Sequence, residues 1–205
     1  ELWTQTLLPE LRAAGIHLKH YRDLTPGQRT DVDEYFRNEV FPVCTPLMLD
    51  PATTVPFISN RSLNLVVALS ADDGTQRLAR VKVPTVIPRL YRLGNRMEFI
   101  LLEEVMKENL AAFFPRVEMS GAWVFRVIRD ADIEIRELEA LDLISTIEGM
   151  IRKRRFGDPV LLEADADMPE VIVDRLLELL DLDDSNLFRT EGLIGLDCLL
   201  QLASI

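Results

Sequence analysis

Positively charged side chains are the residues with the clearest capacity for chemistry, because they gather in two blocks of the sequence. Residues 77–96 contain no acid, and residues 152–155 read Arg-Lys-Arg-Arg. Guanidinium and ammonium groups held close together bind phosphate groups or the carboxylates of a docking partner. The same pattern is also typical of a solvated basic face, so both interpretations stay open. The first block contains Arg77, Arg80, Lys82, Arg89, Arg92 and Arg96.

Two more arginines, Arg126 and Arg129, lie within residues 123–135, WVFRVIRDADIEI. The β-branched and aromatic residues of this segment predict a strand buried on at least one face. Arginines in a strand are most often satisfied by ion pairs, which makes ligand binding the less favoured interpretation. At a spacing of three they point to opposite faces of a regular strand, so we expect that they do not share one phosphate group.

Motifs of the common catalytic classes are absent from the sequence. There is no Gly-rich phosphate loop and no HExxH, CxxC or GxSxG motif. His17 and His20 have no cysteine or carboxylate at ligand spacing, and we expect surface or structural roles for both. We assign no catalytic residue and no metal ligand, so the residues alone do not predict an enzyme.

The composition is typical of a folded globular domain. The 205 residues are 48% apolar and 28% charged, and no apolar run approaches the roughly 20 residues of a membrane span. The net charge of −11 argues against a general affinity for nucleic acid. Cys44 and Cys198 are expected to be buried free thiols in a reducing cytoplasm. We expect a cytoplasmic protein, with membrane association left open, and the first residue, Glu1, suggests a piece of a longer protein.

Apolar periodicity and turn residues predict the elements that position the basic side chains. The helix start at Thr25 carries a capping signal, and its helix is expected to end before Pro42. Further helices are predicted at residues 7–14, at 103–113, at 138–154, after Met168-Pro169 and at 196–202. For the first of these, Thr6 is one candidate N-cap; an earlier start, which would place Trp3, Leu7 and Leu11 on one face, stays open. Strands are predicted at 41–50, 63–69, 77–83, 89–93, 98–102, 123–135, 159–164 and 187–190, with hairpin turns at residues 72–74 and 94–95. This mixture predicts the α+β class, with a mixed, largely antiparallel sheet and hairpins packed against several helices.

Several segments together carry a resemblance to a known family. They are FPVCTPLMLDP and VPFISNRSLNL within residues 41–65, FRVIRDADIEI at 125–135, and RKRRFGDPVLLE at 152–163 followed by Met168-Pro169. In this order and spacing they resemble the middle, or head, domain of bacterial polyphosphate kinase of the first, dimeric type. The resemblance divides the chain into residues 1–24, the end of an N-terminal helical region and a link, and residues 25–205, the middle domain. The catalytic C-terminal domains of that family would lie outside this chain.

The resemblance implies a function for the full-length protein. It would transfer the terminal phosphate of ATP reversibly to polyphosphate through a phosphohistidine, with Mg²⁺. The histidine and most ATP and Mg²⁺ contacts belong to the catalytic domains, so no catalytic residue is carried over and no cofactor is expected on this chain. The head domain would supply contacts of a dimer or higher homo-oligomer and help to shape the polyphosphate tunnel. Its expected partners are another copy, the catalytic domains of the same enzyme and polyphosphate.

Ten basic residues are our candidates for contacts with polyphosphate or with a neighbouring domain. They are Arg77, Arg80, Lys82, Arg89, Arg126, Arg129, Arg152, Lys153, Arg154 and Arg155. Two other functions stay open. The chain could be a stand-alone, non-catalytic interaction module, or a hydrolase of phosphorylated substrates that depends on His17 or His20.

Overall fold

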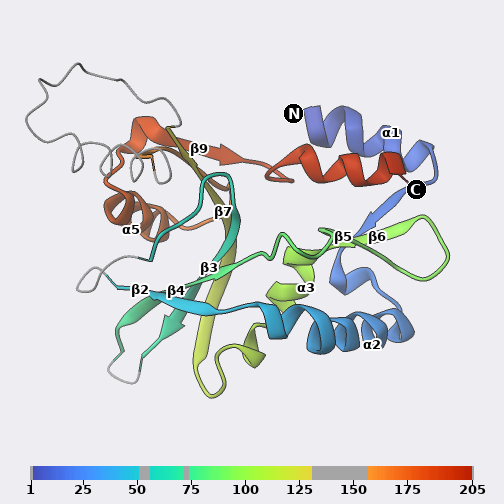
Figure 1. Ribbon diagram of the computed structural model, residues 1–205, viewed down its shortest axis with the longest axis horizontal. Helices are drawn as coiled ribbons and strands as arrows, with labels where there is room; N and C mark the ends of the chain where they lie inside the picture. The colour runs from blue at the N-terminus through green and yellow to red at the C-terminus, as the bar shows by residue number, and fades with distance from the viewer. Residues whose placement is uncertain (1, 51–55, 72–73, 131–156, 205) are drawn as a thin grey trace, which may run out of the picture.

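The computed structural model describes residues 2–50, 56–71, 74–130 and 157–204 (Figure 1). Some sequence predictions fall outside these ranges. They are the turn tip at Asp72 and Asp73, the strand end at residues 131–135, the helix at 138–154 and the basic block Arg152, Lys153, Arg154 and Arg155.

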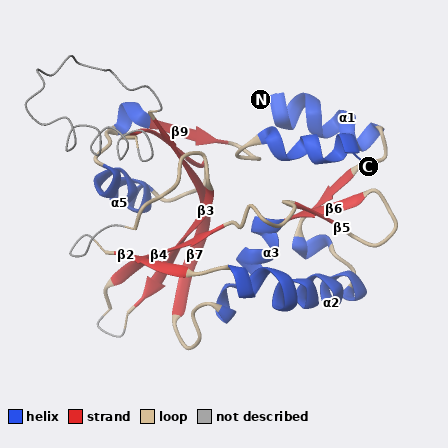
Figure 2. Ribbon diagram, viewed as in Figure 1, coloured by secondary structure: helices blue, strands red, loops and turns tan. Residues whose placement is uncertain are grey.

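A six-stranded sheet forms the centre of the described fold, with the strand order β2-β4-β3-β7-β8-β9 (Figure 2). All neighbouring strands pair antiparallel except β8 and β9, which are parallel. The middle strand β3 is an almost continuous apolar run because side chains cover both of its faces. The strands are β2 (Pro46–Leu49), β3 (Leu63–Ser70), β4 (Gln76–Lys82), β7 (Glu118–Arg129), β8 (Pro159–Asp165) and β9 (Leu187–Thr190).

A smaller sheet of three strands has the order β1-β6-β5. The strands β5 (Leu90–Arg92) and β6 (Glu98–Leu101) form the hairpin predicted around Gly94. The strand β1 (His17–Lys19) pairs parallel with β6, and so attaches the first 24 residues to the rest of the chain. The proposed domain boundary at residue 25 stays a prediction.

The helices cover the large sheet from both sides. The apolar residues of β3 alternate between two cores: Leu65 and Val67 pack with α2 and α3, and Val66 and Ala68 pack with α5. Figure 1 shows α5 on one side of the sheet and α2 and α3 on the other. The α-helices are α1 (Leu8–Ala13), α2 (Pro26–Tyr35), α3 (Leu102–Glu108) and α5 (Glu170–Leu180). Single turns of 3₁₀-helix occur at Tyr21–Asp23, Phe41–Val43, Leu110–Ala112 and Asp184–Asn186, and a longer 3₁₀ segment runs over Leu196–Ser204.

The predicted fold class is confirmed, as are most elements in the described ranges. The capping box of α2 is present: Gln28 N donates to Thr25 Oγ1 at 3.3 Å, and Thr25 N donates to Gln28 Oε1 at 3.0 Å. The hairpin of β3 and β4 forms in the predicted place, with seven residue pairs from Asn64–Lys82 to Ser70–Gln76.

Some element boundaries differ from the prediction. The helix predicted at residues 103–113 is α3, which ends at Glu108 before the 3₁₀ turn at Leu110–Ala112. Thr6 is not an N-cap, because a π-helical turn at Trp3–Leu7 precedes α1. The indole of Trp3 packs against Gly192, where a Cβ atom would lie 2.5 Å from it, and this tertiary contact fixes the earlier start. The second helix does end before Pro42, as predicted: α2 ends at Tyr35 and the π-helical turn that follows it ends at Val40. A separate 3₁₀ turn at Phe41–Val43 replaces the start of the strand predicted at residues 41–50. Near the start of a 3₁₀ turn proline needs no N–H group, so the strand begins only at Pro46.

Candidate functional site

The six described candidate residues come from three parts of the fold. Arg77, Arg80 and Lys82 lie on β4, Arg89 immediately precedes β5, and Arg126 and Arg129 lie on β7. The other four candidates, Arg152 to Arg155, lie outside the described residues. Because side chains alternate along a strand, the sheet divides the candidates between its two faces.

On the α5 face, three of the candidates approach one short segment of backbone. Arg80 Nη1 donates to the carbonyl oxygen of Phe57 at 2.8 Å. Arg129 Nε donates to the carbonyl oxygen of Ile58 at 2.7 Å, and Lys82 Nζ lies 3.5 Å from Ser59 Oγ. We call Arg80, Lys82 and Arg129 the Arg80 cluster. The sequence suggested each of these residues separately, and the structure brings them together.

Arg80 is buried without a balancing charge among the described residues. Only 7% of its surface is exposed, and its Nε atom has no hydrogen-bond partner. Burial disfavours the charged form and lowers the pKa of the guanidinium. Its one acceptor is a neutral carbonyl group, which compensates much less of the lost hydration than a carboxylate would.

Arg129 shares the same surroundings. Its guanidinium lies over the ring of Phe57, with Cζ 4.4 Å from the ring centre, and its Nη1 donates to the carbonyl oxygen of Gly157 at 2.7 Å. Burial lowers the pKa of Arg129, and the charge of Asp158 acts in the opposite direction. Arg80 and Lys82 of the cluster therefore contact neutral oxygen atoms in the described structure, an arrangement that attracts an anion.

Asn64 is a further polar residue on this face that the sequence analysis did not single out. It is fully buried, and its Nδ2 donates to Ser62 O at 2.7 Å, whereas its Oδ1 accepts no hydrogen bond in the described structure. An amide inside the apolar segment Leu63-Asn64-Leu65 was the available signal, because buried polar groups are retained only where something satisfies or uses them.

On the opposite face, the candidate arginines have carboxylate partners. Arg126 Nε donates to Glu163 Oε2 at 2.8 Å, and Thr190 Oγ1 donates to the other oxygen of the same carboxylate at 3.0 Å. Arg129 contacts Ile58 of the α5-side core instead, so the expectation that the two β7 arginines point to opposite faces is confirmed. The favoured interpretation of Arg126 as an ion-paired residue is also confirmed.

Arg89 is the second compensated arginine on this face. Its Nε lies 3.0 and 3.1 Å from the two carboxylate oxygens of Glu103, and its Nη1 donates to Gly195 O at 2.7 Å. Burial, the largest effect, acts to lower the pKa of Arg89, but the hydrogen bonds and charge of Glu103 outweigh it and the pKa is raised. A Cβ atom at Gly195 would lie 3.0 Å from Arg126 and 3.3 Å from Arg89, so this glycine separates the two guanidinium groups.

A cleft of about 710 Å³ opens beside this pair of arginines. Arg61, Arg126 and Arg189 line it together with Glu163, Glu191 and Asp197. Positive and negative groups are thus mixed along its wall, and Arg189 Nη2 already pairs with Glu170 at 2.7 Å. Mixed charge of this kind suits a protein surface better than a chain of phosphates.

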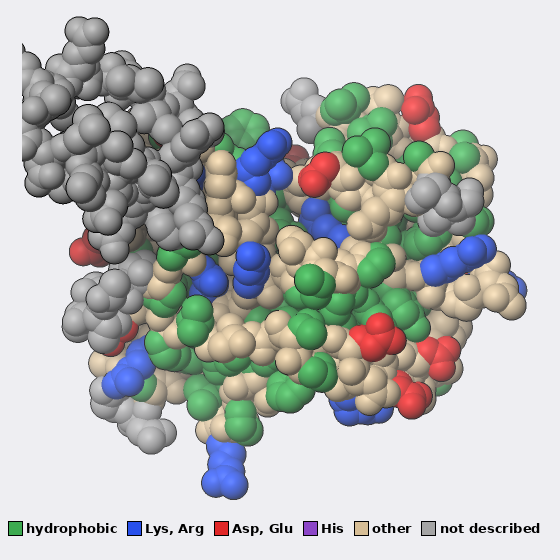
Figure 3. Space-filling view, viewed as in Figure 1, with side chains coloured by type: hydrophobic (Ala, Val, Ile, Leu, Met, Phe, Trp, Pro, Cys, Tyr) green, Lys and Arg blue, Asp and Glu red, His purple; other side chains and the backbone are tan. Residues whose placement is uncertain are grey.

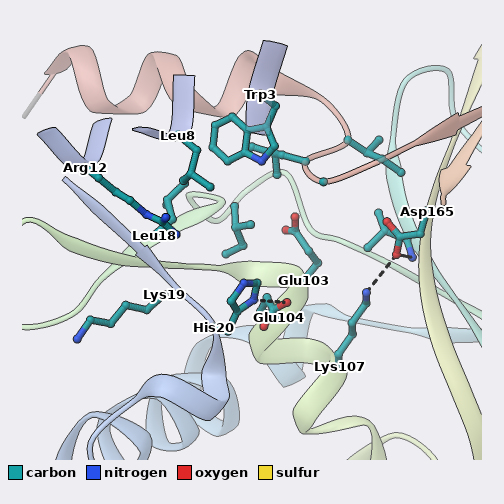
Figure 4. A pocket seen from close by; sticks show the side chains of 15 residues that line it. Trp3, Leu8, Arg12, Leu18, Lys19, His20, Glu103, Glu104, Lys107 and Asp165 are labelled. Atoms are coloured by element: carbon teal, nitrogen blue, oxygen red, sulfur yellow. Dashed lines mark hydrogen bonds and ion pairs between the residues drawn. The ribbon is translucent and has the colours of Figure 1, made fainter. Parts of the chain in front are cut away.

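A smaller cavity of about 170 Å³ lies between the first turn of the chain, α3 and the end of β8 (Figure 4). Two charged pairs line it: Lys107 Nζ lies 3.2 Å from Asp165 Oδ2, and His20 Nδ1 lies 3.4 Å from Glu104 Oε1. Burial raises the pKa of Asp165, while Lys107 and the N–H group of Val124 act to lower it. The sequence analysis missed this cavity because its residues come from separate segments that no motif connects.

The sequence analysis also considered two histidines and two cysteines. His17 and His20 are exposed, and the thiols of Cys44 and Cys198 are free, with burial raising the pKa of each to about 11. In the described ranges, no group of three or more His, Cys, Asp or Glu side chains is arranged to hold a metal ion. None of the helices described is long and apolar enough to cross a membrane.

Comparison with known proteins identifies the family of this chain. Residues 27–202 match the family model described as the polyphosphate kinase middle domain. The chain belongs to the polyphosphate kinase middle domain family. Polyphosphate kinase 1 of Chlorobaculum tepidum is 40% identical over 209 residues, which cover 97% of this chain and 30% of the relative. Polyphosphate kinase of Mycobacterium leprae is 37% identical, with 98% of this chain and 29% of the relative covered.

A solved structure has the same fold as this middle domain. The crystal structure of polyphosphate kinase from Porphyromonas gingivalis aligns with a TM-score of 0.78 and 24% sequence identity, over 98% of this chain and 29% of that one. The middle domain seen here therefore spans about 30% of the length of the relatives that it matches.

Proposed function

We propose that this chain is the head domain of an ATP:polyphosphate phosphotransferase and that its own role is assembly rather than bond making. The observation that carries the proposal is the family match over residues 27–202, in a chain that spans about 30% of its relatives. The full-length protein would extend polyphosphate reversibly from ATP through a phosphohistidine, with ATP and Mg²⁺ held by domains beyond this one. The head domain would supply dimer contacts and a wall of the polyphosphate tunnel.

Exposed apolar side chains support the assembly role. Residues of β2 and the segments beside it have unusually exposed hydrophobic groups, among them Val43, Met48 and Phe57 at 50%, 43% and 42%. The strand β2 is also an edge of the large sheet, and β9 at the other edge carries Phe188 at 58% exposure. Exposed edge strands with apolar side chains are surfaces that proteins normally cover.

The charge distribution also supports docking. On the face seen in Figure 3, acidic side chains gather over α2 and the turn that follows it, and Lys and Arg side chains lie over the large sheet. Asp31 and Glu34 of α2 and Glu39 of the π-helical turn are exposed. Separated charge of opposite sign favours oriented association with another protein surface and makes it sensitive to salt.

Two measurements test the proposal. The full-length protein, supplied with ATP and Mg²⁺, is expected to produce acid-insoluble polyphosphate, and this chain alone is expected to produce none. Hydrolysis of a phosphorylated substrate by the chain alone, lost in the His20→Ala variant, would instead favour the hydrolase interpretation.

Sedimentation equilibrium should reveal self-association of the chain that weakens in the Met48→Glu variant. Val86→Glu is the control, because Val86 is also an exposed apolar residue. A strict monomer at high concentration in both proteins would contradict the dimer role.

A further inference from the structure

Arg80 has no negatively charged partner among the described residues. Arg80 is 7% exposed, donates one hydrogen bond to a carbonyl oxygen and leaves Nε without an acceptor. Removing a guanidinium from water is costly unless an anion replaces the lost hydration. Proteins retain such an arrangement where a ligand supplies the missing interaction, because unsatisfied buried donors are rare otherwise.

The residues around Arg80 add positive charge. Lys82, two residues along the same face of β4, is half-buried, and the only polar contact of its ammonium group in the described structure is Ser59 Oγ at 3.5 Å, the limit for a hydrogen bond. Arg129 donates to the carbonyl oxygens of Ile58 and Gly157, and the charge of Asp158 acts on it. Among the described residues, no ion pair joins Arg80 or Lys82 to a carboxylate.

The number of cations indicates the class of anion. A carboxylate offers two oxygens and a single charge, which Arg80 alone would satisfy. A phosphate group offers three oxygens and close to two charges, and it matches the guanidinium group of Arg80 together with the ammonium group of Lys82. Phe57, whose carbonyl oxygen Arg80 contacts, is itself 42% exposed, so the cluster lies close to the surface.

We propose that the Arg80 cluster is a phosphate-binding site of the head domain, in which Arg80 and Lys82 hold the oxygens of one phosphate group. The group could come from free phosphate or from a unit within a phosphate chain. The second source rests on the proposed function, whereas the first does not.

Isothermal titration calorimetry on the chain, in chloride buffer at constant ionic strength, tests the site with three probes: inorganic phosphate, tripolyphosphate and citrate. We expect one tripolyphosphate per chain, weaker binding of inorganic phosphate if a chain is the natural source, and little binding of citrate. Arg80→Gln and Lys82→Gln should each weaken tripolyphosphate binding by about tenfold or more, the usual value of a charge-assisted hydrogen bond. Arg96→Gln, which removes the same charge from a side chain that is 83% exposed between β5 and β6, should change it by less than about twofold.

Three outcomes would overturn the proposal. Unchanged binding in both Arg80→Gln and Lys82→Gln would remove the site, and an equal loss in Arg96→Gln would reduce it to a general basic surface. Citrate binding as tightly as tripolyphosphate would identify a carboxylate site for a protein partner. Lys82→Gln decides the question if Arg80→Gln fails to fold. Polyphosphate synthesis by the full-length protein is measured separately, so the site can fail while the proposed function stands, and the reverse.

Discussion

The two faces of the large sheet treat buried arginines in opposite ways. On the α3 face, Arg89 and Arg126 each contact a carboxylate, and the pKa of Arg89 is raised because Glu103 outweighs the effect of burial. On the α5 face, Arg80 contacts a carbonyl group and its pKa is lowered by burial. Similar side chains at similar depth therefore differ in whether the protein itself supplies the negative charge. A balanced arginine stabilises the fold, and an unbalanced one is available to a ligand.

Removing the carboxylate of Glu103 is expected to change the free energy of unfolding more than the other variants that test this comparison. In Glu103→Leu, Arg89 stays buried without its partner, and the free energy of unfolding should fall by about 3–5 kcal/mol, the usual cost of breaking a buried pair. Urea denaturation measures the change. The neighbouring Glu104→Leu is the control, because Glu104 is 28% exposed and pairs with an exposed histidine, and it should cost less than about 1 kcal/mol. Equal losses of stability in the two variants would mean that Glu103 does not compensate the buried charge of Arg89.

A double-mutant cycle sharpens the comparison at Arg126. The variants Arg126→Leu, Glu163→Leu and the double variant should give a coupling energy of about 1–3 kcal/mol, because the pair is mostly buried and directly hydrogen-bonded. The same cycle on Arg96 and Glu98, 3.9 Å apart with Arg96 83% exposed, should give less than about 0.5 kcal/mol. A coupling energy near zero for Arg126 and Glu163 would remove the distinction between the two faces.

Local signals in the sequence were sufficient for much of the fold. Thr25 and Gln28 predicted the start of α2, and the Gly94-Asn95 turn predicted the hairpin of β5 and β6, because each depends on neighbours within a few residues. Thr6 failed as an N-cap because the helical structure begins at Trp3, the earlier start that the shared face of Trp3, Leu7 and Leu11 left open. The contact of Trp3 with Gly192, which favours this start, joins residues far apart in the sequence.

The candidate site was predictable only as a set of residue types. Charge clustering identified Arg80, Lys82 and Arg129, and alternation along β7 correctly separated Arg126 from Arg129. The difference between balanced and unbalanced arginines could not be predicted, because it depends on Glu163 from β8 and on the path of the backbone at Phe57. The position of Glu163 and the path of the backbone at Phe57 both depend on the order of the strands in the sheet, which local sequence patterns do not predict.

Glu98 is a carboxylate near the surface whose partner is Lys19, and the pH dependence of stability tests this pair. The hydrogen bond from Lys19, at 3.0 Å, lowers the pKa of Glu98 below its ordinary value of 4.5, and Gln28 adds to the effect. A lowered folded-state pKa gives stability above the unfolded pKa that is lost as the pH falls through the folded value. Glu98→Gln should therefore cost about 0.5 kcal/mol at pH 7 and nothing near pH 2, as measured by urea denaturation. A difference that grows towards low pH would reverse the assignment.

The smallest expected effect belongs to Arg80, and it separates the two faces most directly. In phosphate-free buffer, Arg80→Met removes a buried charge that has no balancing partner in the described structure, together with one hydrogen bond to Phe57. The relief of desolvation should offset the lost hydrogen bond, so the free energy of unfolding should change by less than about 0.5 kcal/mol. Arg89→Met is the matched control and should be destabilised several-fold more, because it leaves Glu103 buried alone. If Arg80→Met lost as much stability as Arg89→Met, the fold itself would balance Arg80, and the charge requirement behind a phosphate site would not exist.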